Sequence, residues 1–325
     1  MGKRSRAAVA VIAVVVAAGW AAAEDQEGAI MAPLAVRSLL LDVAPAGDRL
    51  VAVGERGHVL VSADGGANWR QVPAPTRVML TAVSFCDGRT GLVVGHDAVI
   101  LRTTDGAETF TQVYSDPDAN SPLFDVACLD RTRAFAIGAY GLFLESRDGG
   151  ETWERRTLSD DDAHLHHLAR SESGRLYIAA ERGVVLGSDD GGATWSPLPS
   201  PYEGSLFGTL PLGDAGVLLF GLRGHAFRSE DAGASWLPVE TGVDAMLTGA
   251  CRLVDGRIVV VGLAGVVLVS NDDGRSFVLA EQRDRLGISS VIPTPDGEIV
   301  VAGEFGVRKL PVKAAAGPAA REEEQ

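Results

Sequence analysis

Histidine, aspartate and asparagine side chains that could together bind a divalent cation gather in two segments of the chain. These segments read Asp160-Asp161-Asp162 before His164, His166 and His167, and Asp116-x-Asp118-x-Asn120. Such residues are common ligands of zinc and calcium. The calcium-loop pattern fails, however, because Ser121 stands at its sixth position and Ala127 where a bidentate glutamate is needed. We therefore interpret the segments as solvated acidic loops and expect no metal and no other cofactor.

Arginine side chains offer a second kind of chemistry. Arg56, Arg182 and Arg223 occupy the same position of a repeated four-residue turn. Arginines around one opening can grip a carboxylate through paired hydrogen bonds. A sialidase-type glycoside hydrolase adds an acidic acid/base residue and a tyrosine nucleophile paired with a glutamate. The chain's candidates for the tyrosine–glutamate pair are Tyr140 or Tyr202 with Glu55 or Glu181.

The chain lacks the short motifs of other hydrolases. Neither the G-x-S-x-G elbow of a serine nucleophile nor the H-E-x-x-H pair of a zinc protease occurs in it. We predict no catalytic residue.

These side chains must be positioned by a repeat, because one eight-residue phrase, S-x-D-G-G-x-T-W in its fullest form, occurs six times. Its copies span residues 62–69, 103–110, 146–153, 188–195, 229–236 and 270–277. The aspartate of each copy can accept backbone N–H bonds in a turn, and the glycines allow positive φ. These aspartates are Asp64, Asp105, Asp148, Asp190, Asp231 and Asp272. The aromatic residues that close the copies are expected to pack between neighbouring sheets. They are Trp69, Phe110, Trp153, Trp195, Trp236 and Phe277.

Spacings of 41 to 43 residues between these aspartates predict one small sheet per repeat. Short apolar runs separated by a G-x-x-G-like turn precede each phrase, and a seventh turn at 303–306 has no phrase after it. We therefore predict an all-β, seven-bladed β-propeller over residues 24–312. Ala29–Arg37 should form the missing outer strand beside Val307–Leu310 and so close the ring.

Propeller geometry places the eight-residue phrases on the bottom face, and the G-x-x-G turns and blade-to-blade links on the top face. Loops on a rigid scaffold carry most binding residues, so we expect binding at the top face. The candidate residues there are Arg56, Tyr140, Arg182, Arg223, His164 and His167.

Both ends of the chain differ from the repeats. Residues 1–23 have the basic, apolar and small-residue layout of a cleavable secretory signal, although an uncleaved anchor is an alternative. Cleavage predicts an exported, periplasmic protein, either free or membrane-associated. The Ala/Gly/Pro-rich and acidic segment 313–325 is predicted to be a disordered tail.

The net charge is −14, and loss of the signal's three basic residues would make it −17. Bulk electrostatics therefore disfavour binding to nucleic acid and direct membrane binding after the signal is cleaved. Because no cysteine precedes Cys86, we expect no lipid anchor at the signal junction. Cys86, Cys128 and Cys251 occupy nearly equivalent repeat positions, which predicts buried free thiols rather than a disulfide.

The repeated phrase is the Asp box, or BNR repeat, and the whole chain resembles the photosystem II stability/assembly factor-like family, which also has members in non-photosynthetic bacteria. The resemblance implies a non-enzymatic propeller that binds or helps assemble a membrane or envelope protein complex, a transporter being one candidate. The resemblance also implies that a basic patch on the propeller would dock a membrane-protein partner. The matching turns of blades 2, 3, 6 and 7 carry Asp97, Tyr140, Ala264 and Phe305 instead of arginine.

The alternative function is an Asp-box glycoside hydrolase of the sialidase type. Sialidases resemble six-bladed propellers and carry an R-I-P signature, whereas Arg37 here is followed by Ser38-Leu39. Both differences favour the binding function.

Overall fold

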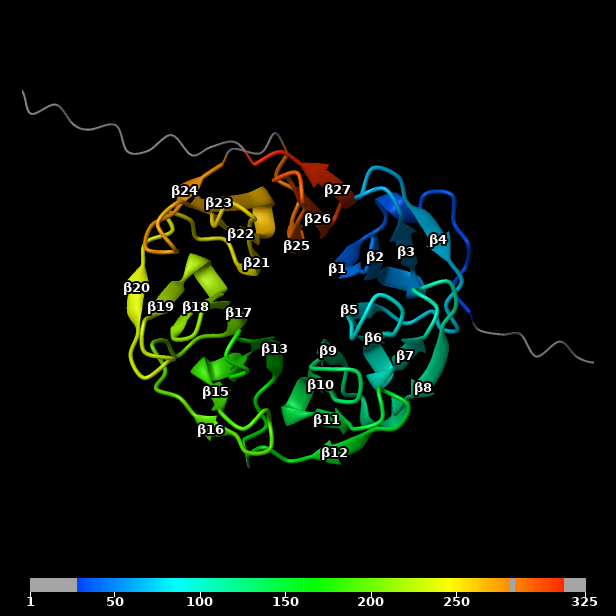
Figure 1. The fold of residues 1–325 in the computed structure, drawn as a ribbon, viewed down its shortest axis with the longest axis horizontal. Helices are drawn as coiled ribbons and strands as arrows, with labels where there is room; N and C mark the ends of the chain where they lie inside the picture. Colours follow the sequence, from blue (N-terminus) through cyan, green and yellow to red (C-terminus); the bar gives the residue numbers. More distant parts are fainter. Residues whose placement is uncertain (1–27, 160, 281–283, 313–325) are drawn as a thin grey trace, which may run out of the picture.

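Seven small antiparallel sheets surround a central channel in a computed structural model that describes residues 28–159, 161–280 and 284–312 (Figure 1). The predicted seven-bladed β-propeller is thereby confirmed. The signal segment 1–23 and the tail 313–325 lie outside the described residues. The described part contains no helix with the length and apolar character needed to cross a membrane.

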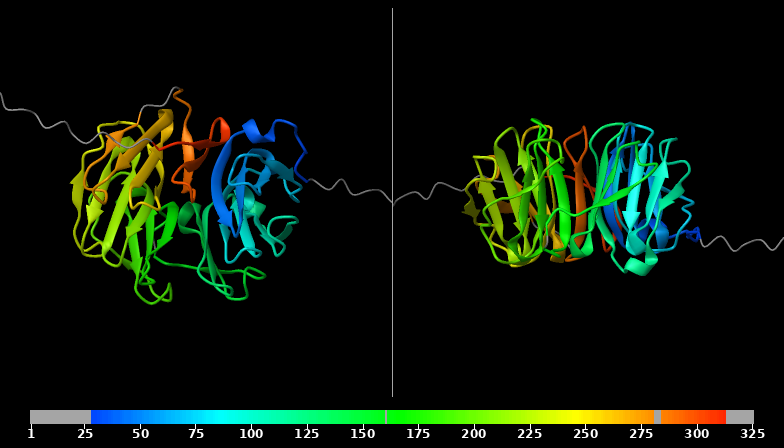
Figure 2. Two further views of the ribbon diagram at one scale, coloured as in Figure 1. Left: turned by 45° about the horizontal axis from the view of Figure 1, so that its top comes forward. Right: turned by 90° about the horizontal axis from the view of Figure 1, so that it is seen from below.

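Each blade runs outward from the channel to the rim, strand by strand in chain order (Figures 1 and 2). The innermost strands are β1 (Leu40–Ala46), β5 (Leu80–Phe85), β9 (Leu123–Cys128), β13 (Leu165–Arg170), β17 (Leu206–Leu212), β21 (Leu247–Arg252) and β25 (Ile288–Pro293). The second strands are β2 (Arg49–Gly54), β6 (Gly91–Gly95), β10 (Ala134–Gly138), β14 (Leu176–Ala180), β18 (Gly216–Gly221), β22 (Ile258–Gly262) and β26 (Ile299–Gly303).

The third strands are β3 (Val59–Ser62), β7 (Ile100–Thr103), β11 (Phe143–Ser146), β15 (Val185–Ser188), β19 (Ala226–Ser229), β23 (Val266–Ser270) and β27 (Gly306–Leu310). The outer strands are β4 (Arg70–Val72), β8 (Thr111–Tyr114), β12 (Glu154–Arg156), β16 (Ser196–Pro197), β20 (Leu237–Val239) and β24 (Val278–Leu279).

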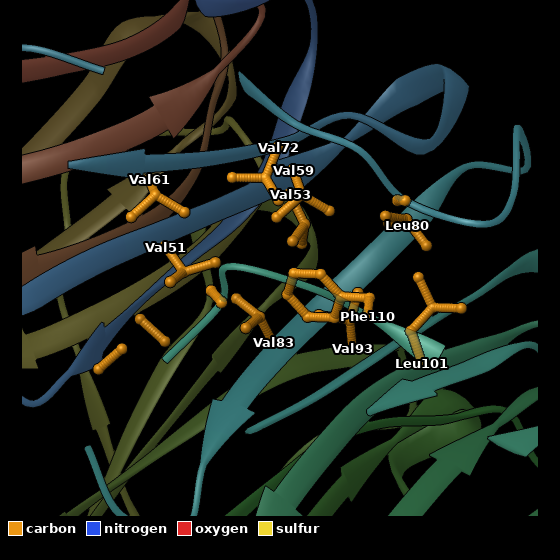
Figure 3. Close-up of a cluster of buried hydrophobic side chains, with 14 of the residues drawn as sticks. Val51, Val53, Val59, Val61, Val72, Leu80, Val83, Val93, Leu101 and Phe110 are labelled. Atoms are coloured by element: carbon orange, nitrogen blue, oxygen red, sulfur yellow. The ribbon is translucent and has the colours of Figure 1, made fainter. Parts of the chain in front are cut away.

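The hydrophobic core is divided among the seams between blades. The second strands of the blades are largely apolar on both faces, because each face packs against a neighbouring blade. Figure 3 shows one such seam, where Val51 and Val53 of β2 meet Val93 of β6 and Leu101 of β7. Phe110, the aromatic residue that closes the second Asp box, lies in the same cluster. The other Asp-box aromatics also lie in seams: Trp69, Trp153, Trp195, Trp236 and Phe277.

The Asp box of blade 3 shows how the bottom turns are held. Asp148 accepts backbone N–H bonds from Glu151 and Thr152, both at 2.9 Å, and a hydroxyl bond from Thr152 at 2.5 Å. Ser146 donates its hydroxyl to the same carboxylate at 2.9 Å and accepts the Gly150 N–H at 2.8 Å. These bonds lower the pKa of Asp148 to about 2.

Arginines from one blade also bond the Asp-box backbone of the next blade, a contact that the repeat pattern did not reveal. Arg102 donates to the Gly149 carbonyl at 2.8 Å, and Arg156 donates to the Gly192 carbonyl at 2.9 Å. The buried Arg228 donates to the Asp273 carbonyl at 2.8 Å. Arg49 of blade 1 likewise donates to the Gly106 carbonyl of blade 2 at 3.0 Å, so among the described residues these bonds join the bottom face across four seams.

The predicted closure by an N-terminal strand is wrong. Blade 7 has three strands, and residues 35–37 form the short 3-10 helix η1 (Ala35–Arg37) against β27. Pro33 begins a turn in which Ala35 N–H bonds the Ala32 carbonyl, so the chain bends instead of extending. The ring closes through side chains instead: apolar residues of blades 1 and 7 share one cluster, and Ser290 donates to Asp42 at 2.7 Å.

The prediction of unpaired thiols is wrong for two of the three cysteines. Cys86 and Cys128 form a disulfide between blades 2 and 3, with their Cα atoms 4.8 Å apart. The prediction assumed that equivalent positions of neighbouring blades lie too far apart for a disulfide. At the ends of the inner strands they lie close together, because these strands converge on the channel. Cys251 is buried and unpaired, as predicted.

Candidate functional site

The top face displays an exposed side chain at one fixed backbone position in six of the seven blades. In blades 1 to 6, a one-turn 3-10 helix joins the second and third strands: η2 (Glu55–Gly57), η3 (His96–Ala98), η5 (Ala139–Gly141), η6 (Glu181–Gly183), η7 (Leu222–Gly224) and η8 (Leu263–Gly265). The middle residue of each has φ between 54° and 56°: Arg56, Asp97, Tyr140, Arg182, Arg223 and Ala264. The turn imposes a left-handed backbone conformation that is uncommon for such residues. The turn therefore also determines the direction in which these side chains project.

Two of these residues, Tyr140 and Arg182, meet His164 and Glu181 where blade 3 contacts blade 4. The rings of Tyr140 and His164 lie 4.8 Å apart, and the Tyr140 N–H points to Nδ1 of His164 at 3.3 Å. Nε2 of His164 lies 3.9 Å from a carboxylate oxygen of Glu181. Glu181 in turn accepts a 2.8 Å bond from Arg182. The structure thus brings together three of the predicted residues: Tyr140, His164 and Arg182.

Aromatic rings continue from this cluster into the mouth of the channel. His164 lies 5.9 Å from the ring of Phe124, which lies 5.7 Å from His166, and His166 lies 4.6 Å from Phe207. We call Tyr140, His164, Phe124, His166 and Phe207 the top-face strip. Nε2 of His166 is buried without a hydrogen-bond partner in the described structure, and burial lowers the pKa of His166 to about 4. His166 is therefore uncharged near neutral pH.

The channel itself forms a cavity of about 430 Å³, with lining residues from all seven inner strands. A β-bulge near the start of every inner strand sets this lining, as the register shift between Leu165 and His167 illustrates. A bulge turns two consecutive side chains toward the lumen. In blade 4 these are His166 and His167, and in blade 3 they are Phe124 and Asp125.

The second of the two bulge side chains contacts the backbone of the next blade when it can accept a hydrogen bond. Asp42 of blade 1 accepts the Val83 N–H of blade 2 at 2.9 Å. Asp125 of blade 3 accepts the Leu168 N–H at 2.7 Å, and Nδ1 of His167 faces the Thr209 N–H at 3.4 Å. We call Asp42, Asp125 and His167 the latch residues. His167 thus lies inside the channel, deeper than its predicted place on the top face.

Burial in the channel wall moves the pKa values of the latch residues away from their ordinary range. It raises the pKa of Asp42 to about 6 and that of Asp125 to about 7, against the opposing effect of their hydrogen bonds. It lowers the pKa of His167 to about 4. Sequence reasoning missed the two aspartates; aligning the inner strands on their first apolar residue would have placed Asp42 and Asp125 at the position of His167.

The three predicted arginines do not converge on one site. Arg182 lines a pocket with Tyr202, whereas Arg223 lines a different pocket with His225, and Arg56 lies on blade 1. Ion pairs with Asp161, Asp162 and Glu181 already surround Arg182. The described residues therefore do not assemble the three-arginine carboxylate clamp of a sialidase.

The same ion pairs account for part of the acidic loop that precedes His164. Asp161 and Asp162 both bind Arg182. Asp160 lies outside the described residues. The part of the chain that the structure describes holds no group of three or more His, Cys, Asp or Glu residues arranged for a metal ion.

The family model for photosynthesis system II assembly factor YCF48 matches residues 29–121 and 115–259, which is most of the propeller. The chain belongs to the YCF48 family. The photosystem II assembly lipoprotein Ycf48 of Synechococcus sp. (strain CC9902) is 25% identical over 126 residues. That match spans 38% of this chain and 37% of the relative's length.

Solved structures agree with the YCF48-like fold. A structure of YCF48 bound to D1 peptide has a TM-score of 0.71 at 19% identity and covers 88% of this chain and 95% of that one. YCF48 from Cyanidioschyzon merolae gives 0.69 at 19% identity, covering 85% and 96%. The WD40 propeller domain of Doa1 gives 0.68 at 14% identity, covering 85% and 94%. At these identities, the likeness shows the fold alone.

Proposed function

We propose that this protein is an exported, non-enzymatic propeller that binds a segment of a membrane or envelope protein complex through its top face. Membership of the YCF48 family supports a role in assembly. A structure of one YCF48 protein is of its complex with D1 peptide, which supports a polypeptide as the ligand here as well.

The observation that carries the proposal is the top-face strip. Its rings step from Tyr140, which is 55% exposed, to Phe207 at the channel mouth, with centroid separations between 4.6 and 5.9 Å. Aromatic side chains give large contact areas at a low cost in conformational entropy and dominate many interfaces. A strip of this kind suits an extended segment with apolar side chains.

Charged side chains beside the strip would orient a bound partner segment. Glu181, Asp161 and Asp162 neutralise Arg182, so this end of the strip is not a free cationic patch. Arg223 forms no ion pair with any described residue and lies exposed on the neighbouring blade 5. A partner segment with an acidic group beyond its apolar residues would match this order.

Comparison of Tyr140→Ala with Asp97→Ala tests the proposal. Both residues occupy the same left-handed turn position, with φ of 54° and 56°, so the two substitutions cost the backbone similar amounts. Capture of the native partner from solubilised envelope should fall roughly tenfold or more for Tyr140→Ala and stay unchanged for Asp97→Ala. Equal capture by wild type and both variants would refute a role for the strip.

A further inference from the structure

A cluster on blade 1, remote from the top-face strip, combines exposed apolar and basic side chains. Ile30, Met31 and Leu34 are 63%, 52% and 64% exposed. Arg37, Arg56 and Arg77 are exposed beside them, and none of the three forms an ion pair with a described residue. We call these six residues the blade-1 patch. Its charge is opposite to the net charge of −14 of the whole chain.

Backbone contacts hold the apolar residues of this patch in place. Ala29 N–H bonds the Ala74 carbonyl at 2.9 Å, and the side chain of Gln71 bonds both the Ile30 carbonyl and the Ala32 N–H. Gln71 also contacts the buried His58 at 3.0 Å. The segment is therefore attached to the β4 side of blade 1, so the exposure of its outward side chains is a feature of the fold.

Within this segment, the side chains divide into inward and outward sets. Ala32, Ala35 and Val36 pack into the cluster between blades 1 and 7. Ile30, Met31 and Leu34 project to solvent although they are the larger residues. Three large apolar side chains exposed on one short segment form a patch of the kind that interaction sites present.

The arginines are joined to the same segment. Nε of Arg77 donates to the Gly28 carbonyl at 2.9 Å. Gly57, the neighbour of Arg56, lies against Ala29, since a Cβ atom added to Gly57 would be 3.3 Å from the Cβ of Ala29. Arg37 closes the turn by donating its N–H to the Leu34 carbonyl at 2.8 Å. Glu55, next to Arg56 in the chain, forms no ion pair within the described structure.

We propose that the blade-1 patch docks onto a lipid bilayer that contains anionic headgroups. Apolar side chains that enter the boundary between headgroups and acyl chains, flanked by arginines that reach phosphates, are typical of interfacial binding. Charge complementarity supports an anionic bilayer as the occupant: Arg37, Arg56 and Arg77 are exposed without an ion-pair partner among the described residues, and they flank three exposed apolar side chains.

The proposal revises the expectation that an acidic chain avoids membranes. Electrostatic attraction to a charged bilayer decays within a Debye length of roughly 8 Å at physiological salt, so local charge decides contact. Docking here would turn the rim of blade 1 to the bilayer, and the top face would lie close to emerging segments of membrane proteins. The inference goes beyond the proposed function, because it requires lipid alone and no protein partner.

Vesicle sedimentation of the mature chain, which begins at Glu24 after the predicted cleavage, tests the proposal, with vesicles of phosphatidylcholine alone or with about 30% phosphatidylglycerol. Wild type should bind the anionic vesicles at least tenfold more tightly than the neutral ones. Arg37→Gln/Arg56→Gln/Arg77→Gln should weaken that binding on the order of 100-fold, since each basic residue contributes roughly fivefold. Ile30→Ser/Met31→Ser/Leu34→Ser should weaken binding to both kinds of vesicle.

A charge-matched control separates the patch from net charge. Arg89→Gln/Arg131→Gln/Arg155→Gln removes three exposed arginines elsewhere and should bind like wild type. Equal losses in the control and the patch variant, or binding insensitive to both patch variants, would overturn the proposal. Equal binding of the wild type to neutral and anionic vesicles would also overturn the proposal. Melting temperatures of all variants exclude unfolding as the cause of lost binding, and retained partner capture by the patch variants would leave the top-face function standing.

Discussion

Asp125 offers the sharpest test of the channel chemistry, through the substitution Asp125→Asn. Its carboxylate accepts the Val126 N–H at 2.8 Å and the Leu168 N–H of the next blade at 2.7 Å, and its side chain is 14% exposed. Burial raises the pKa of Asp125 from 3.8 to about 7. Asparagine keeps the size and one acceptor oxygen but cannot ionise.

The sign of the effect follows from proton binding. Between pH 4 and pH 7, folded wild type binds a proton at Asp125 that the unfolded chain has released, so its free energy of unfolding falls as pH rises. A shift of about 3 pKa units corresponds to at most about 4 kcal/mol. Because the channel admits solvent, which reduces the burial cost, we expect about 1–2 kcal/mol. Asp42, whose pKa is also raised, acts in the same direction in both proteins, and His167 acts mainly below pH 6.5.

Urea unfolding at pH 5 and pH 8, at constant ionic strength, measures the difference. At pH 5 the variant should be less stable by roughly 1 kcal/mol, because one of the two backbone bonds loses its acceptor. That deficit should disappear or reverse by pH 8. Asp148→Asn is the control, because the lowered pKa of Asp148 leaves it ionised across this range, so its deficit should be constant. A constant deficit for Asp125→Asn, or one that grows with pH, would refute the assignment of a buried, largely protonated carboxyl.

Three further perturbations test the framework. Asp148→Ala should lower the free energy of unfolding by about 1–3 kcal/mol through lost turn bonds while partner capture persists; lost capture at full stability would contradict a structural role. Cys86→Ser/Cys128→Ser should lower the free energy of unfolding by about 2–4 kcal/mol for a loop of this length. A reductant should destabilise the wild type and the Cys251→Ser control but not this double variant. Arg228→Ala should cost about 1–3 kcal/mol, because the buried guanidinium bonds Glu230 and the Asp273 carbonyl; unchanged urea midpoints would show that this seam is held by other contacts.

The repeat made the architecture predictable, because the Asp box marks the same turn in six blades and its closing aromatic marks a seam. The closure of the ring was not predictable from the repeat. It depends on the Pro33 turn and on contacts between residues far apart in the sequence, namely the apolar cluster shared by blades 1 and 7 and the bond from Ser290 to Asp42. The disulfide between Cys86 and Cys128 likewise depends on how closely inner strands approach at the channel.

The candidate site was predictable in part. The turn position identified Tyr140 and Arg182, and the structure brings both beside His164. Sequence alone did not show that Arg182 is neutralised by its neighbours or that His167 faces the channel. The first fact follows from ion pairs with Glu181 and with Asp161 and Asp162 of the preceding link, and the second from the β-bulge in β13.

The most direct test of the top-face proposal is site-specific photo-crosslinking in the native envelope. A photoreactive amino acid replaces Tyr140 on the top face or Glu151, an exposed Asp-box residue on the bottom face of the same blade. We predict that position 140 crosslinks to a membrane or envelope protein, identified by mass spectrometry, and that position 151 does not. Crosslinks to the same protein from both positions, or from position 151 alone, would contradict binding through the top face.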